Sequence, residues 1–164
     1  MKTPHQTNIT LTHQRDDDFY SACCRELSKA YHIGAGYKTV RSLVSATLHR
    51  TAPQFYISHT SALRRLRELR RRNYHPTYSS KQQMWTDLEE RVSALERRHG
   101  ITLSTALMRV LADCRAPRFY LSQSAGEKIF RTRRTANRNH NTTLKTVNHQ
   151  WLYHSPSTPS NQRF

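Results

Sequence analysis

One seven-residue segment occurs twice in this chain, and its recurrence constrains the fold more than any other feature. Residues 52–58 read Ala-Pro-Gln-Phe-Tyr-Ile-Ser, and residues 116–122 read Ala-Pro-Arg-Phe-Tyr-Leu-Ser. Five of the seven positions are identical, and the apolar residues upstream also match, with Leu43 over Leu107 at the same offset. We therefore expect a tandem duplication whose copies pack about a pseudo-twofold axis, because each copy alone has too few apolar residues for a core.

Each copy is predicted to contain two helices, a short extended segment and a third helix. Apolar residues recur at helical spacing on both sides of each seven-residue segment, which we call a box. Pro53 forces extended backbone at the residue before it, and Phe55 and Ile57 alternate with polar neighbours as in a strand. The predicted fold is mainly α, a tandem pseudo-twofold repeat of helix-helix-short strand-helix, whose boxes are able to pair as a two-stranded antiparallel ribbon.

The composition divides the chain into repeats and polar ends. Asp16, Asp17 and Asp18 can cap a first helix, and the aromatic pair that follows is expected to correspond to Met84-Trp85 in the second copy. The C-terminal stretch is rich in Asn, Thr, Ser, Pro and His, so it buries too little surface to offset its ordering entropy. The predicted segments are a disordered arm at 1–15, repeat 1 at 16–73, a linker at 74–80, repeat 2 at 81–134 and a disordered basic, polar tail at 135–164.

Positive charge is concentrated in the helix that follows each box. The chain has 27 Lys and Arg against 11 Asp and Glu, and only Glu68 offsets the arginines after the first box. Ordinary solvated helix faces interleave both signs, so we expect these side chains to pair with phosphates of a nucleic acid. Another polyanion, an acidic protein partner and simple solvation are the alternatives. The predicted phosphate contacts are Arg64, Arg65, Arg67, Arg70, Arg71 and Arg72 in the first copy, and Lys128, Arg131, Arg133 and Arg134 in the second.

The boxes allow a second mode of nucleic-acid recognition and a purely structural one. A ribbon that turns its aromatic Phe residues inward would present its polar side chains to a major groove, an arrangement similar to ribbon-helix-helix repressors. In the structural interpretation, which we favour, proline sets the entry, the aromatic residues fill the core and serine caps the next helix. The candidate base-reading residues are Gln54, Tyr56, Ser58, Arg118, Tyr120 and Ser122.

The sequence contains no catalytic or metal-binding motif. Cys23, Cys24 and Cys114 lack CxxC spacing, the ten histidines form no HxxxH or HExxH motif, and no glycine-rich phosphate loop is present. Cys24 beside Arg25 is the candidate for a reactive thiolate. No apolar run approaches the ~20 residues of a membrane span, and the N-terminus lacks a secretory signal. We predict a cytoplasmic, non-enzymatic protein that needs no cofactor or metal.

At the paired A-P-x-F-Y-[IL]-S boxes the chain resembles small, uncharacterised two-repeat proteins of gut bacteria and of their phages or mobile elements. The resemblance spans about residues 19–134. It implies no catalytic residues, and it implies a phage or mobile-element setting, with a virion-associated location for a phage component. The predicted function is nucleic-acid binding, to DNA or RNA. The alternative is a structural or assembly subunit of a phage or ribonucleoprotein complex, in any oligomeric state, whose tails order on a protein partner.

Overall fold

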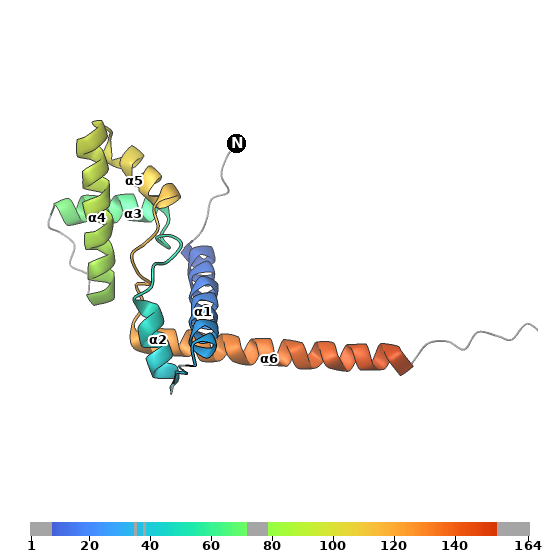
Figure 1. Ribbon diagram of the computed structural model, residues 1–164. Helices are drawn as coiled ribbons and strands as arrows, with labels where there is room; N and C mark the ends of the chain where they lie inside the picture. Colours follow the sequence, from blue (N-terminus) through green and yellow to red (C-terminus); the bar gives the residue numbers. More distant parts are fainter. Residues whose placement is uncertain (1–7, 35, 38, 72–78, 154–164) are drawn as a thin grey trace, which may run out of the picture. The chain divides into compact units, whose positions relative to one another are not determined.

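The computed structural model is mainly helical, as the sequence predicts, and it describes residues 8–34, 36–37, 39–71 and 79–153 (Figure 1). The chain divides into two units, residues 1–130 and 131–164, and α6 contributes its first turns to the first unit. None of the helices within the described ranges is long and apolar enough to cross a membrane. The helices are α1 (Asn8–His32), α2 (Val40–Leu48), α3 (His59–Arg70), α4 (Ser79–His99), α5 (Leu103–Asp113) and α6 (Gln123–Tyr153).

Local sequence signals explain where most of these helices begin and end. Hydroxyl side chains cap the N-termini of α2, α3 and α5: Thr39 accepts from the Ser42 amide, Ser58 from the Ser61 amide and Thr102 from the Thr105 amide. Gly34 follows α1 with φ 68°, and Gly100 follows α4 with φ 62°. Only glycine adopts this left-handed conformation without steric cost, so both glycines fit helix ends.

The predicted boundaries of the two polar ends differ from the structure. α1 begins at Asn8, so Asp16, Asp17 and Asp18 lie within the helix and do not cap it. Leu11 is only 3% exposed, and its burial favours the extra N-terminal turns. α6 continues through Tyr153, which lies within the segment predicted to be disordered. No proline occurs between the start of α6 at Gln123 and Pro156, so none interrupts the helix. The outermost parts of the predicted arm and tail, 1–7 and 154–164, lie outside the described residues.

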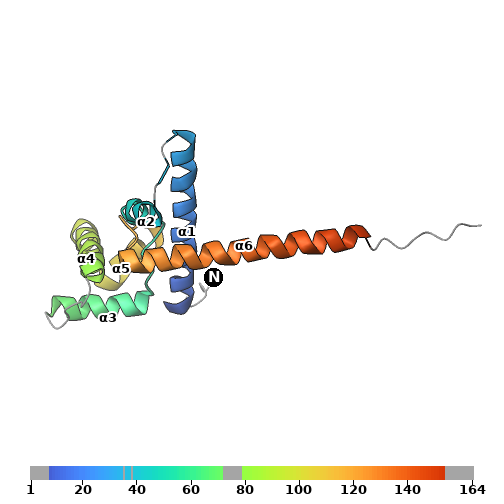
Figure 2. The same ribbon diagram turned by 90° about the horizontal axis from the view of Figure 1, so that it is seen from below.

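The helices of the first unit form two groups, and each group takes its third helix from the other half of the sequence. α1 packs against α2, while α4 and α3 both pack against α5. The first turns of α6 lie against the first group, because Gly126 approaches Val44 of α2 and Phe19 of α1. Figures 1 and 2 show α3 with α4 and α5, and the start of α6 with α1 and α2. We call this arrangement the third-helix exchange.

The two boxes run past each other between the groups. The Ala52 amide donates to the Ala116 carbonyl at 2.9 Å, which forms an isolated antiparallel bridge. The described residues contain no β-strand, so the predicted two-stranded ribbon is not formed. The aromatic rings pair across the boxes, with Phe55 stacked on Tyr120 and Tyr56 stacked on Phe119. Both phenylalanines belong to one continuous buried core, so the boxes join the two helix groups.

Each box is also tied to the first helix of its own half by a tyrosine. The Tyr56 hydroxyl donates to Asp18 Oδ2 of α1 at 2.8 Å, and the Tyr120 hydroxyl donates to Asp87 Oδ2 of α4 at 2.6 Å. The two hydrogen bonds are alike: Asp18 accepts one in the first half of the chain, and Asp87 accepts the other in the second half. The correspondence of residues 19–20 with Met84-Trp85 stays a prediction.

Candidate nucleic-acid interface

Two arginines of α3 and the arginine at its C-cap form an exposed stripe on one side of the helix. Ala62 and Leu66 are buried, which directs this face of α3 into the core. Arg64, Arg67 and Arg71 are exposed and form no ion pair with any carboxylate of the described residues. Their i, i+3, i+7 spacing places them on one helix face over about 10 Å of helix length. We call these three residues the α3 stripe.

Two other predicted phosphate contacts are engaged with carboxylates of the fold. The Arg70 guanidinium donates to Glu89 Oε1 at 2.9 Å and to Glu96 Oε2 at 2.5 Å, and it also reaches Ser93 Oγ. Hydrogen bonding to Glu96 is the main cause that raises the pKa of Arg70. Arg65 pairs with Glu68 at 2.7 Å. Arg70 therefore holds α3 on α4 with its charge neutralised, and Arg72 lies outside the described residues.

The predicted contacts of the second copy lie along α6. Lys128 is exposed and belongs to the first unit. Arg131 and Arg134 are exposed and Arg133 is half-buried, and all three belong to the second unit. The α3 stripe is therefore the set of predicted contacts that the structure brings together on one surface of the first unit.

Five of the six candidate base-reading residues make hydrogen bonds within the fold. Tyr56 and Tyr120 do not point outward as a ribbon requires, because their hydroxyls donate to aspartates. Burial, followed by these hydrogen bonds, raises the pKa of both hydroxyls. Ser58 and Ser122 accept amide hydrogens in the first turns of α3 and α6. Arg118 donates to Gln83 Oε1, and the amide nitrogen of Gln54 is buried. These contacts agree with the structural interpretation of the boxes.

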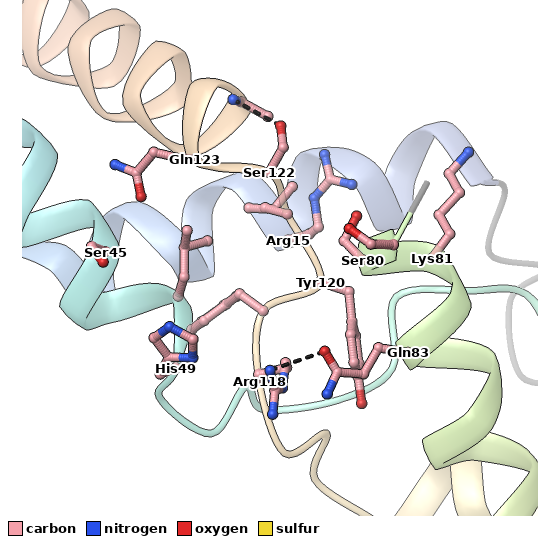
Figure 3. A pocket seen from close by; sticks show the side chains of 15 residues that line it. Arg15, Ser45, His49, Ser80, Lys81, Gln83, Arg118, Tyr120, Ser122 and Gln123 are labelled. Carbon is pink, nitrogen blue, oxygen red and sulfur yellow. Dashed lines mark hydrogen bonds between the residues drawn. The ribbon is translucent and has the colours of Figure 1, made fainter. Parts of the chain in front are cut away.

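Sequence reasoning missed a pocket in the first unit, because its residues come from segments far apart in the chain. The pocket has a volume of about 780 Å³. Figure 3 shows side chains of α1, α2, the start of α4, the second box and the start of α6 around it. Its lining includes the cations Arg15, Lys81 and Arg118 together with His49, and it includes no carboxylate residue. Arg15 is paired with Asp16 at 2.7 Å and Arg118 donates to Gln83 at 3.0 Å, so two of these cations already have partners in the fold.

The cysteines differ strongly in their surroundings, which gives a prediction about thiol chemistry. Cys23 is fully buried, and burial raises the pKa of its thiol to about 11, whereas Cys24 is exposed. We expect iodoacetamide at pH 8 to alkylate Cys24 at least about tenfold faster than Cys23, because only Cys24 is accessible and Cys23 stays protonated. Peptide mass spectrometry measures both rates, and denaturant should abolish the difference. Equal rates in the native protein would contradict the described packing of α1.

Within the described ranges, no three or more His, Cys, Asp or Glu side chains gather as a metal site. A scan against protein-family models, a search of curated proteins and a search of solved structures each found no match to this chain.

Proposed function

We propose that this protein is a non-enzymatic nucleic-acid-binding protein that contacts the phosphate backbone through the α3 stripe. The observation that carries the proposal is the exposure of Arg64, Arg67 and Arg71 on one helix face without a carboxylate partner. Phosphates of one strand follow each other at ~3.4 Å along a duplex axis, so a stripe about 10 Å long spans several of them. Guanidinium groups bind phosphate oxygens in a bidentate geometry, which suits this role.

The placement of the acidic residues supports binding over mere solvation. The fold supplies carboxylates to Arg65 and Arg70, the neighbours of the stripe on the same helix. It supplies none to Arg64, Arg67 and Arg71, although like charges at helical spacing cost ~0.2–0.5 kcal/mol per pair. A polyanion that neutralises all three removes this repulsion and releases its own counterions.

The proposal includes a tandem duplication as the origin of the fold. It is supported by the matched contacts of the halves: each box tyrosine bonds an aspartate of its own first helix, and the boxes pair through Ala52 and Ala116. Small residues also occupy matching positions of the third helices, at Ala62 and Gly126. The phage or mobile-element setting and the cytoplasmic location remain predictions that rest on the sequence.

A salt series with stripe variants tests the proposal. Fluorescence anisotropy measures binding of a labelled DNA duplex and of an RNA hairpin between about 50 and 200 mM salt, the range over which phosphate contacts weaken most clearly. In the triple variant Arg64→Gln, Arg67→Gln, Arg71→Gln, the slope of log K against log salt should fall in magnitude by about 2–3, roughly 0.9 per lost duplex phosphate contact. The preferred polymer is the one bound more tightly at equal salt.

Two controls separate the stripe from net charge. The triple variant Arg25→Gln, Arg109→Gln, Arg115→Gln removes the same charge from exposed positions outside α3 and should leave the slope nearly unchanged. The single variant Arg41→Gln removes one charge from an exposed position of α2 and should likewise leave the slope nearly unchanged. Equal losses in both triple variants, or binding without salt dependence, would contradict the α3 stripe as the interface.

One observation favours the alternative function, a structural or assembly subunit. Apolar side chains are exposed at and just beyond the C-terminal end of α1, where Tyr31 is 84% and Ile33 77% exposed and Leu27 lies one turn earlier. A group of exposed apolar side chains at one helix end is a candidate surface for a protein contact. A complex that survives high salt and is lost on Tyr31→Ser, Ile33→Ser would support this alternative.

A further inference from the structure

The C-terminal half of α1 carries a row of apolar side chains on its exposed side. Cys24, Leu27 and Tyr31 are all exposed, and their i, i+3, i+7 spacing places them on one helix face. Tyr31 is 84% exposed. We call these three residues the α1 ridge. The ridge continues from Tyr20, whose ring packs on Phe130 with 5.7 Å between the ring centroids, so it extends outward from the core of the first unit.

A row of basic side chains runs along the same exposed side of α1. Arg25, Lys29 and His32 lie at i, i+4, i+7 and are exposed. Arg25 and His32 each follow a ridge residue by one position, so the basic row is parallel to the α1 ridge. Lys29 reaches Glu26 at 3.4 Å, but its side chain remains 70% exposed.

The carboxylates of this part of α1 are already engaged within the fold. Glu26 is the only acidic residue between positions 21 and 32; it is 6% exposed, and Arg50 Nη2 lies 2.9 Å from its Oε2. Asp17 is exposed two turns before Cys24, and it has an interaction of its own. A molecule that approaches the α1 ridge therefore meets apolar and positive groups.

The other side of the same turns is held in place by the fold. Cys23 is fully buried and its thiol hydrogen-bonds with Thr47 of α2, while Ala30 is only 9% exposed. The bond between Glu26 and Arg50 fixes the same stretch of α1 to the segment that follows α2. Figure 2 shows the last turns of α1 extending past α2. A surface held in this way loses little freedom when a partner binds, which favours affinity.

From this arrangement we propose that the α1 ridge and its basic row bind an acidic amphipathic helix of a partner protein. Apolar side chains of such a helix would lie against Leu27 and Tyr31, and its carboxylates would face Arg25 and Lys29. Tyrosine is one of the residues that contribute most to binding at protein interfaces, which suits the exposed Tyr31 to this role.

Charge and size argue against two other occupants. A second copy of the chain would bring its own net charge of +16, so the two copies would repel each other. An anionic membrane would attract the cations, but three apolar side chains supply little of the buried area on which interfacial binding depends. The proposal goes beyond nucleic-acid binding and does not rest on the α3 stripe, and it gives the alternative function a partner of defined chemistry.

Fluorescence anisotropy tests this surface with the full-length protein and three labelled peptides. The first peptide is an amphipathic helix of about 20 residues with leucines at i, i+3, i+4 and i+7 and glutamates beside them. Lysines replace the glutamates in the second peptide, and serines replace the leucines in the third. The first should bind at least about tenfold more tightly than either of the others, because only it matches both the α1 ridge and the basic row.

Variants of the protein locate the binding surface. The double variant Leu27→Ser, Tyr31→Ser should weaken binding of the first peptide by about tenfold, and Arg25→Gln, Lys29→Gln should weaken it mainly at low salt. The matched control is Met108→Ser, because Met108 is an apolar side chain of α5 that is 58% exposed, and it should leave binding unchanged. Circular dichroism checks that each variant is folded.

The possible outcomes decide between the occupants. Equal binding of the first and third peptides overturns the proposal, because attraction then depends on net charge alone, and so does unchanged binding in Leu27→Ser, Tyr31→Ser. Tyr31-dependent binding to phosphatidylserine vesicles without a preference for the first peptide, or Tyr31-dependent dimerisation in analytical ultracentrifugation, also overturns it. The α3 stripe variant Arg64→Gln, Arg67→Gln, Arg71→Gln should keep the preference for the first peptide, so failure of the proposed function is recognised separately.

Discussion

Replacement of both Tyr56 and Tyr120 by phenylalanine is expected to lower the free energy of unfolding by about 3 kcal/mol, roughly 1.5 kcal/mol for each hydroxyl. Each hydroxyl donates to a partly buried carboxylate, Asp18 or Asp87, which would lose its partner without gaining full access to water. A loss of this size is a large fraction of the 5–15 kcal/mol typical of a small domain. It would also loosen the join between the boxes and the first helices.

Urea unfolding followed by circular dichroism measures the loss. Tyr31→Phe is the matched control, because it makes the same chemical change at a side chain that is 84% exposed, and it should alter stability by less than about 0.5 kcal/mol. The single variants Tyr56→Phe and Tyr120→Phe show whether the two losses of stability are additive. Coupling is expected because Tyr120 stacks on Phe55, next to Tyr56, and Tyr56 stacks on Phe119, next to Tyr120. A double variant as stable as Tyr31→Phe would mean that these hydrogen bonds are not formed.

The same tyrosines predict a loss of stability in alkaline solution. Burial raises the pKa of both hydroxyls above the value of about 10 that tyrosine has in an unfolded chain. Below pH 10 both states are protonated and the full contribution is present; above pH 10 the unfolded state loses its protons first, so stability falls as pH rises. Unfolding measured from pH 8 to pH 11 should show a steeper decline for the wild type and Tyr31→Phe than for the double variant.

The second large effect is expected at Gly126, where α6 meets α1 and α2. A Cβ atom at this position would lie 2.8 Å from Val44 Cγ1 and 3.1 Å from Phe19 Cζ. Val44 and Phe19 are both fully buried, so neither can move away freely. Gly126→Val should therefore destabilise the protein by about 2–3 kcal/mol through overpacking.

A control and a compensating change make this result specific. Gly36→Val adds the same side chain where no atom lies within 4 Å of the new Cβ, and it should leave stability nearly unchanged. Combining Gly126→Val with Val44→Ala should recover part of the loss, since the smaller residue makes room for the new methyl groups. Additive losses in this double variant would show that Gly126 and Val44 are not in contact.

Much of the helical framework follows from short-range signals in the sequence. Ser58 caps α3, Gly34 and Gly100 close α1 and α4, and each of these residues acts on its own turn of the chain. The predicted start of α1, at Asp16 to Asp18, was wrong because the helix begins at Asn8. The three aspartates are good capping residues, but the single apolar side chain of Leu11 gains more by burial when the helix continues past them.

Only the tertiary structure shows which arginines are exposed and which are paired with carboxylates. Arg67 and Arg70 occupy equivalent positions in an Arg-rich run, and composition assigns both to the phosphate contacts. Only the packing of α3 on the second half brings Arg70 to Glu89 and Glu96, 19 and 26 residues away. The pocket is equally long-range, because Arg15 and Arg118 are brought together across most of the first unit. The pattern of charges along one helix does not show which residues of other helices will lie beside it in the fold.

The third-helix exchange was also beyond the reach of sequence periodicity. The stripe that contains Ala62 and Leu66 is buried equally well against its own half or against the other, so the pattern of apolar residues is the same for both arrangements. The boxes decide between them, since they pair at Ala52 and Ala116 and run past each other between the helix groups.

The exchange also has a consequence for the order of events during synthesis on the ribosome. α1 and α2 leave the ribosome early, but the helix that covers them is made after the other described helices, so their apolar faces stay open to solvent and to chaperones until α6 has been synthesised. Contacts between distant parts of a chain also form slowly, because a long loop must close before they contribute. The packed state of the first unit is thus reached only when the start of α6 is present, and a product that terminates before α6 would expose the surface around Phe19 and Val44.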